Sequence, residues 1–428
     1  MTADNSMVNL AGEGLFGGRF LGRRVLVTGH TGFKGTWLAE WLLCMGADVI
    51  GFSAKEPVSE PALFDVQFPS SFPRLGVADV RGDICDREQI VQLLKKWQPD
   101  LVFHLAAQSL VRSSYRQPFE TFATNVMGTA SLLDALRNTG RSCAVVVVSS
   151  DKCYENHNTA HPCREGDPLG GHDPYSSSKA CAELVVDAYR HSFFAERAGS
   201  ASPREPRLLL ASARSGNVIG GGDWALDRII PDCVRSLAHG EPVTVRNPHA
   251  TRPWQHVLEP LGGYLTLGAR LLERLDARNI DACPPGHSRI PTASPLESGF
   301  NFGPDSASNH TVRELVEEFL KSWPEANATV EADNVGLWKE FSGNNEPLEA
   351  THLRLAIDKA RHLLDWRPVW NFSTAVRHTG EWYHRYIAVM TATKGTAELD
   401  KFTRMQIRDY CKDAARQRLL WANPDGIR

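Results

Sequence analysis

The sequence has no long apolar run and no excess of one charge, and each absence narrows what the chain does. None of its apolar runs approaches the roughly 18 residues that a membrane helix needs. The N-terminus is acidic and glycine-rich, unlike the basic and then apolar start of a signal peptide. A formal net charge of -3 over 428 residues argues against a nucleic-acid footprint. We therefore expect a cytoplasmic protein with neither a membrane nor a nucleic acid as partner.

The cysteines and histidines lack the spacing of disulfide frameworks or metal sites. The nine cysteines are odd in number and scattered, with no Cys-x-x-Cys pair, so we expect reduced and mostly buried thiols. The 15 histidines show no ligand spacing, and we predict no metal. There are no internal repeats. The apolar content of 42% is enough for a sizeable globular core.

A glycine-rich turn joins an apolar strand to an apolar helix near the start of the chain. The strand is expected over 24–28, and the helix runs from Trp37 until Gly46 stops it. Glycines at every third position allow a tight turn, close approach of a pyrophosphate and close helix packing, while the helix N-terminus offers free N–H groups. The sequence therefore predicts a dinucleotide-binding loop made of Gly29, Thr31, Gly32, Phe33, Lys34 and Gly35.

Strands and helices then alternate. Buried strands are expected over 48–52, 101–107 and 144–150, with helices between them. This order predicts an α/β fold, a Rossmann-like doubly wound parallel sheet whose ligands gather at the carboxyl ends of the strands. Four polar residues lie at one such end: Ser149, Ser150, Asp151 and Lys152. Two residues that follow another strand, Asp83 and Ile84, suit an adenine contact.

Tyr175 and Lys179 lie one helical turn apart, and residues i and i+4 share a helix face. A lysine there favours the tyrosinate, so it lowers the phenol pKa from about 10 towards the range of a general base. Because about 25 residues separate Ser150 from Tyr175, we expect the serine, the carboxylate and the two ammonium groups to converge on the phenol.

We divide the chain into a nucleotide-binding domain and a smaller, mainly C-terminal substrate-binding lobe. Residues 1–21 are expected to be a flexible arm, and the Rossmann domain spans 22–220, with returns around 254–275 and 298–304. The lobe takes 221–253 and 305–428, and 277–298 reads as an irregular insertion. In the lobe, the forked guanidinium of Arg252 suits a pyrophosphate.

Several motifs together resemble the extended short-chain dehydrogenases/reductases that act on nucleotide sugars. They are Gly29–Gly35, His104–Gln108, Asn125, Tyr175 with Lys179, and Arg214–Gly220. Finer details resemble the CDP-glucose 4,6-dehydratases, namely Ser150–Asn156, Gly170–Tyr175, Gly220–Trp224 and Arg252–Val257. The resemblance covers the chain from about Arg23 to Tyr383.

This resemblance implies a redox cycle in which a bound NAD stores a hydride. Tyr175 would remove the sugar O4 proton, with Lys179 as its electrostatic partner and ribose ligand, and Ser149 or Ser150 would donate to O4. Asp151 matches the family's acid for the C6 hydroxyl. Lys152 stands where dTDP-glucose dehydratases carry a glutamate, so it either shuttles the C5 proton or stabilises the enolate.

The resemblance also implies the remaining binding residues and the assembly. Ser53, Leu105, Ala106, Ala107 and Ser149 would contact the cofactor, as would Tyr175 and Lys179. Gln108, Asn125, Arg214, Asn217 and Arg252 would contact the nucleotide sugar. Family members often dimerise through a helix bundle, so we expect a homodimer or a higher homo-oligomer.

Two questions stay open at this stage. The acid that marks NAD after the second strand is absent, and Phe52-Ser53-Ala54-Lys55 includes a lysine that suits a 2′-phosphate; we expect NAD because the hydride returns to its own substrate. The Asp151–Lys152 pair favours a dehydratase over a 4-epimerase, which only rotates its keto sugar, and over an inactive nucleotide-binding protein. The choice of CDP-glucose rests on the resemblance alone.

Overall fold

A computed structural model gives the fold of most of the chain. It describes residues 9–56, 59–68, 76–156, 161–194, 206–280, 294–305, 308–323, 338–340, 353–391 and 397–423.

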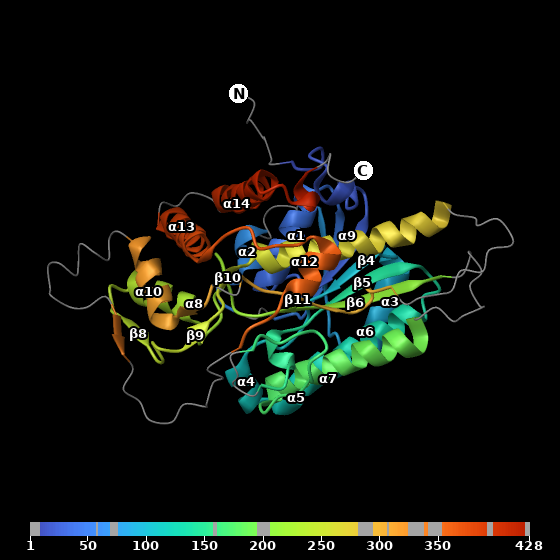
Figure 1. Cartoon of the computed structure of the whole chain (residues 1–428), viewed down its shortest axis with the longest axis horizontal. Coiled ribbons are helices and arrows are strands. Elements are labelled where there is room, and N and C mark those ends of the chain that lie inside the picture. The colour runs from blue at the N-terminus through green and yellow to red at the C-terminus, as the bar shows by residue number, and fades with distance from the viewer. Residues whose placement is uncertain are drawn as a thin grey trace.

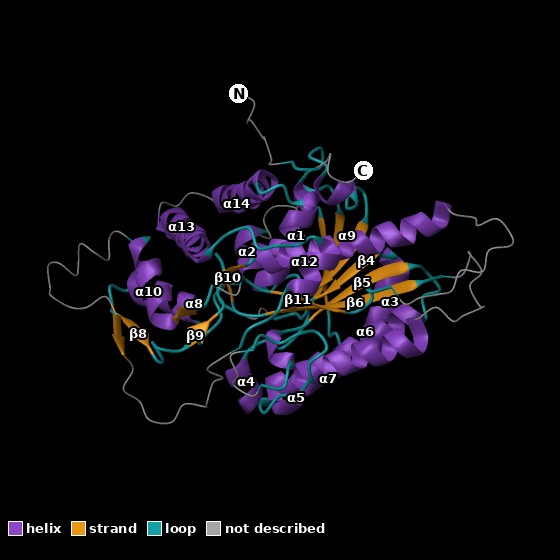
Figure 2. Ribbon diagram, viewed as in Figure 1, coloured by secondary structure: helices purple, strands orange, loops and turns teal. Residues whose placement is uncertain are grey.

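A seven-stranded, wholly parallel sheet forms the centre of the molecule (Figure 2). Its order is β11-β6-β5-β4-β1-β2-β3. The chain runs outward from β1 to β3 and then crosses to β4 on the other side of β1, which opens a crevice at the carboxyl ends of β1 and β4. The predicted doubly wound sheet is confirmed. The strands are β1 (Arg24–Thr28), β2 (Asp48–Ser53), β3 (Val77–Arg81), β4 (Leu101–His104), β5 (Cys143–Val148), β6 (Leu208–Ser215) and β11 (Gly299–Phe302).

Helices cover both faces of the sheet because its strands are apolar on both faces. Val25 and Val27 of β1 pack into one core cluster with residues of α1 and α9, and Leu26 packs into a second with residues of α3, α6 and α7. Figure 1 shows these helices on opposite sides of the strands. Their bounds are α1 (Phe33–Cys44), α3 (Arg87–Trp97), α6 (Gly128–Arg137), α7 (Pro174–Tyr189) and α9 (Leu258–Ile280). Short helices α2 (Leu63–Gln67), α4 (Val111–Arg116) and α5 (Pro118–Phe122) lie between them in the chain, and α12 (Asp358–Leu364) follows α9.

The smaller lobe lies to the left in Figure 1, beyond the carboxyl ends of the strands. It contains α8 (Ile229–Ala238), α10 (Val312–Lys321) and short strand pairs, and α13 (Phe372–Thr391) packs on α10. The expected capping box of α10 is confirmed, since Thr311 and Glu314 each bond the other's backbone N–H. The paired strands are β7 (Val218–Ile219) with β10 (Gln255–His256), β9 (Thr251–Arg252) with β12 (His310–Thr311), and β8 (Val243–Val245) with β13 (Trp338–Glu340).

The two ends of the chain differ from the predicted arm and lobe. Phe16 and Phe20 are buried, and Phe16 stacks on Trp421 with ring centroids 4.8 Å apart, so the described part of the expected arm, residues 9–21, is packed. The tail helix α14 (Ala397–Arg416) packs on α1, where Arg404 pairs with buried Glu40 at 2.5 Å. The tail therefore covers the Rossmann domain. The apolar side chains that pack here are interspersed with charged residues in the sequence. A search for a single helical period therefore does not detect them.

Helix α9 extends into the insertion expected at 277–298. Helix α9 continues to Ile280, residues 281–293 lie outside the described part, and Glu297 is buried and paired with Arg207 just before β11. None of the described helices has the length and apolar character needed to cross a bilayer.

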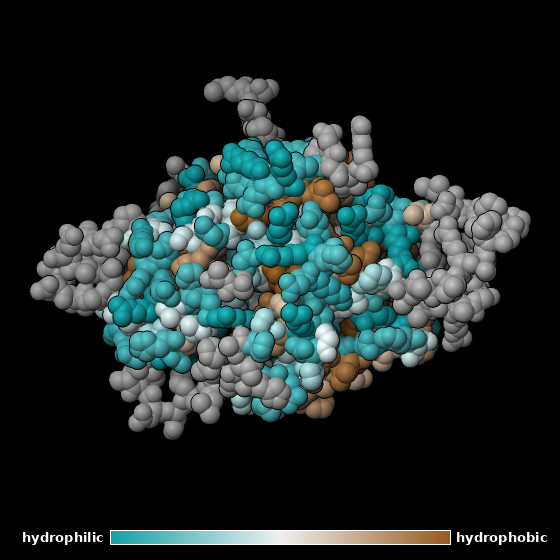
Figure 3. Space-filling model, viewed as in Figure 1, coloured by the Kyte–Doolittle hydropathy of each residue, from teal (hydrophilic) through white to brown (hydrophobic). Residues whose placement is uncertain are grey.

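Part of the surface is apolar. Figure 3 is largely teal, and brown atoms gather along its lower right edge, where α5 and α7 lie in Figure 1. The exposed side chains there include Phe119 of α5, which is 79% exposed, Met127 at 59% and Leu184 of α7 at 57%. We call these three residues the helix patch.

Candidate active site

The glycine loop between β1 and α1 is shaped for a ligand. Gly29 has a φ of 74°, and a Cβ there would lie 2.8 Å from the backbone nitrogen of Ala106. A Cβ on Gly35 would lie 2.1 Å from the carbonyl oxygen of Gly29, so α1 packs directly on the turn. Gly32 precedes α1 and no side chain caps the helix. The first N–H groups of α1 are thus available to an anion such as a pyrophosphate.

The other predicted cofactor residues surround this loop. The hydroxyls of Ser53 and Thr31 hydrogen-bond at 2.7 Å over the ends of β1 and β2. Asp83 accepts from the backbone N–H of Cys85, and Ile84 is buried against Gly128. Leu105, Ala106 and Ala107 follow β4 and are half-buried. These positions are compatible with a dinucleotide lying across the strand ends.

A carboxylate on β3, that of Asp79, lies beside the last residues of β2. Asp79 pairs with Gly51 of β2 and binds the Nε2 atom of His30 at 2.8 Å and Nε of Arg81 at 2.7 Å. Burial would raise the pKa of Asp79, but these two hydrogen bonds hold it at about 2. Asp79 is therefore a charged acceptor that sequence reasoning missed, because it lies on the third strand instead of the second.

Helix α7 carries the tyrosine and the lysine. Pro174 begins the helix and Asp173 caps it by accepting from the N–H of Ser176 at 2.9 Å. Tyr175 and Lys179 are 8% and 7% exposed. Both lie on α7, four residues apart.

The expected lowering of the phenol pKa is wrong. Burial raises the pKa of Tyr175 to about 12, and a hydrogen bond from Ser150 offsets this only in part. Burial likewise lowers the pKa of Lys179 to about 8, although Glu183 favours its charge. Desolvation disfavours both charged forms and outweighs the effect of spacing.

Ser150 and Asp151 form a tight turn after β5, at the site predicted from the sequence. The hydroxyl of Ser150 donates to Oδ1 of Asp151 at 3.0 Å and accepts from the N–H of Lys152 at 3.2 Å. Asp151 is 4% exposed, and its Oδ2 would lie 2.3 Å from a Cβ on Gly216. Burial raises the pKa of Asp151 by more than Lys152 lowers it. A buried carboxyl that keeps its proton can act as a general acid.

Lys34 reaches the same place from the glycine loop. Its Nζ donates to Oγ of Ser215 at 2.9 Å, and Ser215 hydrogen-bonds to the hydroxyl of Tyr264 at 2.6 Å. Burial and the neighbouring charge of Arg228 lower the pKa of Lys34 to about 7, and Lys34 interacts electrostatically with Asp151. The sequence places Lys34 in the cofactor loop but does not reveal that it faces the acid.

The lobe contributes an arginine that sequence reasoning missed. Arg228 lies just before α8 and pairs with Asp223 at 2.7 Å. Arg228 lies close enough to the phenol of Tyr175 for its positive charge to lower the pKa of the phenol. The available signal was the Gly220–Trp224 motif, which ends beside Asp223 and leads into Arg228.

Two predicted substrate residues are instead bound to other protein groups. Nδ2 of Asn125 donates to Ser178 at 2.8 Å and to the carbonyl of Gln108 at 3.0 Å, and Oδ1 accepts from the N–H of Gln108. The side chain of Gln108 in turn donates to Thr121 at 2.9 Å and accepts from the N–H of Leu110 at 2.5 Å. This network positions the loop after β4 against α7.

The two predicted arginines have different surroundings. Arg214 is buried, with NH2 on Glu183 at 2.8 Å and NH1 on Tyr154 at 2.7 Å, so its guanidinium holds β6 to α7 instead of reaching a substrate. Arg252 is half-buried on β9 and its charge acts on Asp151. Asn217, also half-buried, follows β6, and its carbonyl accepts from Gln255 at 3.2 Å. Arg252 and Asn217 thus lie near the carboxyl ends of the strands.

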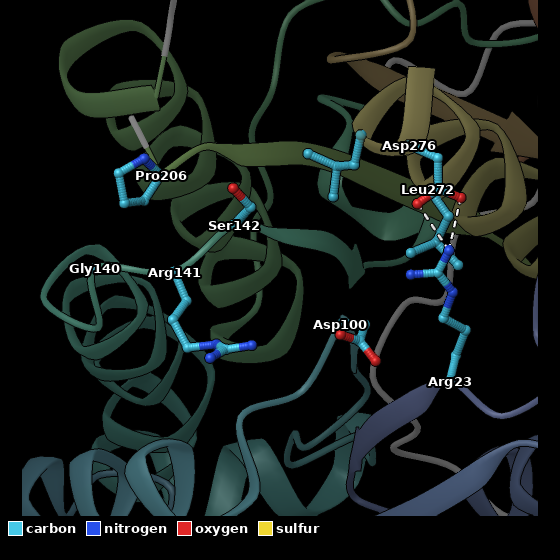
Figure 4. A pocket seen from close by; sticks show the side chains of 9 residues that line it. Arg23, Asp100, Gly140, Arg141, Ser142, Pro206, Leu272 and Asp276 are labelled. Atoms are coloured by element: carbon cyan, nitrogen blue, oxygen red, sulfur yellow. Dashed lines mark hydrogen bonds and ion pairs between the residues drawn. The ribbon is translucent and has the colours of Figure 1, made fainter. Parts of the chain in front are cut away.

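A separate hollow lies at the opposite, amino edge of the sheet (Figure 4). Its volume is about 350 Å³, and its lining includes Arg23, Asp100, Arg141 and Asp276. Arg23 binds Asp276 at 2.7 Å in this hollow. None of the residues described above lines it, so it is not part of the candidate active site.

Comparisons with known proteins agree with this geometry. A family model described as GDP-mannose 4,6 dehydratase matches residues 26–264. A CDP-glucose 4,6-dehydratase from Salmonella typhimurium is 40% identical over 366 residues, which are 86% of this chain and 92% of that protein. A human dTDP-D-glucose 4,6-dehydratase is 25% identical and covers 71% of this chain and 74% of its own length.

Solved structures share the fold. The dTDP-glucose 4,6-dehydratase from Bacillus anthracis in complex with NAD aligns with a TM-score of 0.63 at 20% identity, covering 85% of this chain and 97% of that one. An epimerase from Methanothermobacter thermautotrophicus aligns with a TM-score of 0.65 at 22% identity, covering 91% and 99%. Both reactions thus occur on this fold, and side chains at the strand ends must distinguish them.

Proposed function

We propose that this chain, which belongs to the GDP-mannose 4,6 dehydratase family of nucleotide-sugar dehydratases, converts CDP-D-glucose into CDP-4-keto-6-deoxy-D-glucose and water with NAD as bound cofactor. The choice of CDP-glucose rests on the 40% identical relative that covers most of the chain. The choice of NAD rests on the glycine loop and on the NAD-bound dehydratase of the same fold.

The side chains divide the chemistry among them. The bound NAD supplies a hydride acceptor that later returns the hydride to C6. Tyr175 takes the O4 proton while Lys179 holds the ribose and supports the developing charge. The resulting 4-keto group acidifies C5, and Lys152 either shuttles the C5 proton or stabilises the enolate. Asp151 protonates the departing C6 oxygen, which leaves as water.

The buried carboxyl of Asp151, whose pKa is raised by burial, is the observation that carries the proposal. A 4-epimerase removes no hydroxyl and has no need of an acid beside its keto sugar. Asp151 is 4% exposed, bonded to Ser150 at 3.0 Å, and burial raises its pKa. This acid lies near the tyrosine because the turn after β5 packs against α7, whose first turn carries Tyr175.

One assay tests the reaction and the substrate together. Purified protein is incubated with NAD and CDP-glucose, and the products are weighed by mass spectrometry. We expect loss of one water. An isomer of unchanged mass would instead identify an epimerase. Unchanged CDP-glucose together with dehydration of dTDP- or GDP-sugars would exclude CDP while retaining the dehydratase reaction.

The role of Lys152 has its own test. We expect Lys152→Ala to slow water elimination while Tyr175→Phe blocks the first oxidation, because a lysine acts after the keto group has formed. Exchange of the C5 hydrogen with deuterated water, followed by mass spectrometry, monitors this step directly. Elimination at the wild-type rate in Lys152→Ala would contradict the role.

We also propose that the protein is a homodimer whose helix patch is buried between the copies. Phe119, Met127 and Leu184 are large, apolar and exposed on adjoining elements. Such a surface is expected on a single chain when a second copy covers it in the dimer. Light scattering after gel filtration should give twice the mass of one chain for the wild type. Phe119→Asp should shift it towards the monomer, whereas Leu226→Asp, at an exposed apolar residue outside the patch, should not.

A further inference from the structure

The end of β2 lacks the carboxylate that marks NAD in many Rossmann-like folds. An acid at this place accepts from the ribose 2′-OH of NAD, and an arginine nearby accommodates the 2′-phosphate of NADP. In this chain β2 ends at Ser53, whose hydroxyl is hydrogen-bonded to Thr31, and Ala54 and the exposed Lys55 follow. None of the last three residues is negatively charged. A chain that uses NAD therefore needs another way to exclude a 2′-phosphate.

Arg81, the last residue of β3, places its guanidinium across the end of β2. It is paired in register with Ser53, and a terminal nitrogen of the guanidinium donates to the carbonyl oxygen of Ala54 at 3.3 Å. Its Cζ atom lies 5.4 Å from the centroid of the Phe64 ring, so an aromatic side chain packs against the planar group. The side chain of Arg81 remains 25% exposed. A guanidinium held at this place is chemically suited to bind a phosphate.

The carboxylate of Asp79 contacts the same guanidinium. Asp79 lies two residues before Arg81, on the same face of β3. Its Oδ1 accepts from Nε of Arg81 at 2.7 Å and from Nε2 of His30 at 2.8 Å. Burial lowers the pKa of His30, although Asp79 raises it, so the imidazole is neutral. Arg81 is therefore the cation of this three-residue cluster.

The glycine loop fixes the position of Asp79 from the other side. His30 belongs to that loop and is fully buried, and its ring packs edge-on against Phe64 with centroids 4.8 Å apart. A Cβ on Gly51 of β2 would overlap the imidazole, so glycine at this position admits the His30 ring. The Asp79 side chain is only 15% exposed. Its carboxylate is thus held beside Arg81 instead of turning out to solvent.

We propose that Asp79 selects NAD over NADP by holding Arg81 in an ion pair, so that β3 supplies the selectivity for which β2 has no acid. A 2′-phosphate at the end of β2 would compete with Asp79 for the guanidinium and would meet the repulsion of its carboxylate. The neutral 2′-OH of NAD meets neither obstacle. The inference rests on the proposed function only for the class of cofactor, because nucleotide binding does not require the sugar reaction.

The test measures how tightly the full chain, freed of bound nucleotide, binds NAD and NADP in a calorimetric titration. We expect the wild type to bind NAD more tightly. Asp79→Asn keeps the side-chain shape and an oxygen for His30 but removes the charge. It should shift the ratio of the two dissociation constants towards NADP by about 10-fold, as expected of one partly screened charge. The shift should shrink as the salt concentration rises.

Two further variants separate the role of the ion pair from general effects of substitution. Adding Arg81→Met to Asp79→Asn should abolish the gain in NADP binding, because the phosphate then has no guanidinium to bind. Asp48→Asn removes an exposed carboxylate at the opposite end of β2 and should leave the ratio at its wild-type value. Thermal melts check that each variant is folded.

Three results would overturn the proposal: a wild type that binds both nucleotides equally, a folded Asp79→Asn with an unchanged ratio, or a gain that persists without Arg81. The last would show that another cation, such as Lys55, binds the phosphate. Each of these leaves the dehydratase function standing if the wild type removes water from its substrate. A wild type that removes no water from any nucleotide sugar would overturn the function, while the binding ratios would still decide the selectivity.

Discussion

Two clusters of buried charge lie at neighbouring strand ends and differ in how their charges are matched. Around β6, Arg214 pairs with Glu183 at 2.8 Å, and Ser212 donates to the same carboxylate at 2.8 Å. After β5, Asp151 lies in the field of Lys152, Lys34 and Arg252, none of which forms a direct ion pair with it among the described contacts. The first cluster has one cation for one anion at contact, and the second has cations at a distance.

The pKa values show the consequence. Burial would raise the pKa of Glu183, but contact with Arg214 lowers it below the usual range. Burial raises the pKa of Asp151, and the more distant cations do not compensate. A buried acid at contact distance from its counterion stays charged and structural, while one without such contact can keep a proton for chemistry.

The largest effect should come from removing the phenol. Tyr175→Phe should lower kcat by about 1,000-fold, because the O4 proton then has no acceptor. The unfolding temperature should change little, since the ring still fills its place. Product formation measured by mass spectrometry checks the first expectation, and a thermal melt checks the second.

Removing the cation of the Arg214–Glu183 ion pair should reduce the stability of the protein more than its activity. Arg214→Met leaves Glu183 buried without its cation and should reduce the free energy of unfolding by about 3–5 kcal/mol. Urea denaturation measures this loss. The double variant Arg214→Met with Glu183→Leu removes both charges and should recover part of it. A stable Arg214→Met protein with a raised KM would instead support a substrate contact.

Removing the acid should leave oxidation intact. Asp151→Asn should lower dehydration by about 100-fold while transfer of the C4 hydride continues, because the amide has no proton to give to C6. Absorbance of the reduced cofactor should then accumulate. Equal loss of hydride transfer and dehydration would contradict a separate role for Asp151.

The smallest effect should come from Lys34 and appear in the pH profile. Its ammonium favours the charged form of Asp151, so Lys34→Met should raise the pKa of that acid further. Activity needs the protonated acid and falls as pH rises through its pKa. The alkaline limb should therefore move to higher pH in Lys34→Met, by less than about one unit at an effective dielectric near 20. Movement to lower pH would exclude this coupling.

The sequence alone determined the sheet, the glycine loop and the candidate acid and base. These features depend on residues close together in the chain: the alternation of apolar strands and helices, glycines at every third position, and the i, i+4 spacing of Tyr175 and Lys179. The two residues that follow Ser150 were found because strand ends in a parallel sheet share one edge. Local spacing was sufficient to predict these features.

Only the tertiary structure decided which charges meet. Lys34 and Asp151 are far apart in sequence and face each other because α1 and the ends of β5 and β6 adjoin. The sequence predicts the same role for Arg214 and Arg252. In the structure Arg214 forms an ion pair with Glu183, and Arg252 lies near Asp151. The phenol pKa followed burial rather than spacing. Desolvation and ion pairing depend on the full set of neighbours, and the order of strands in the sheet assigns those neighbours.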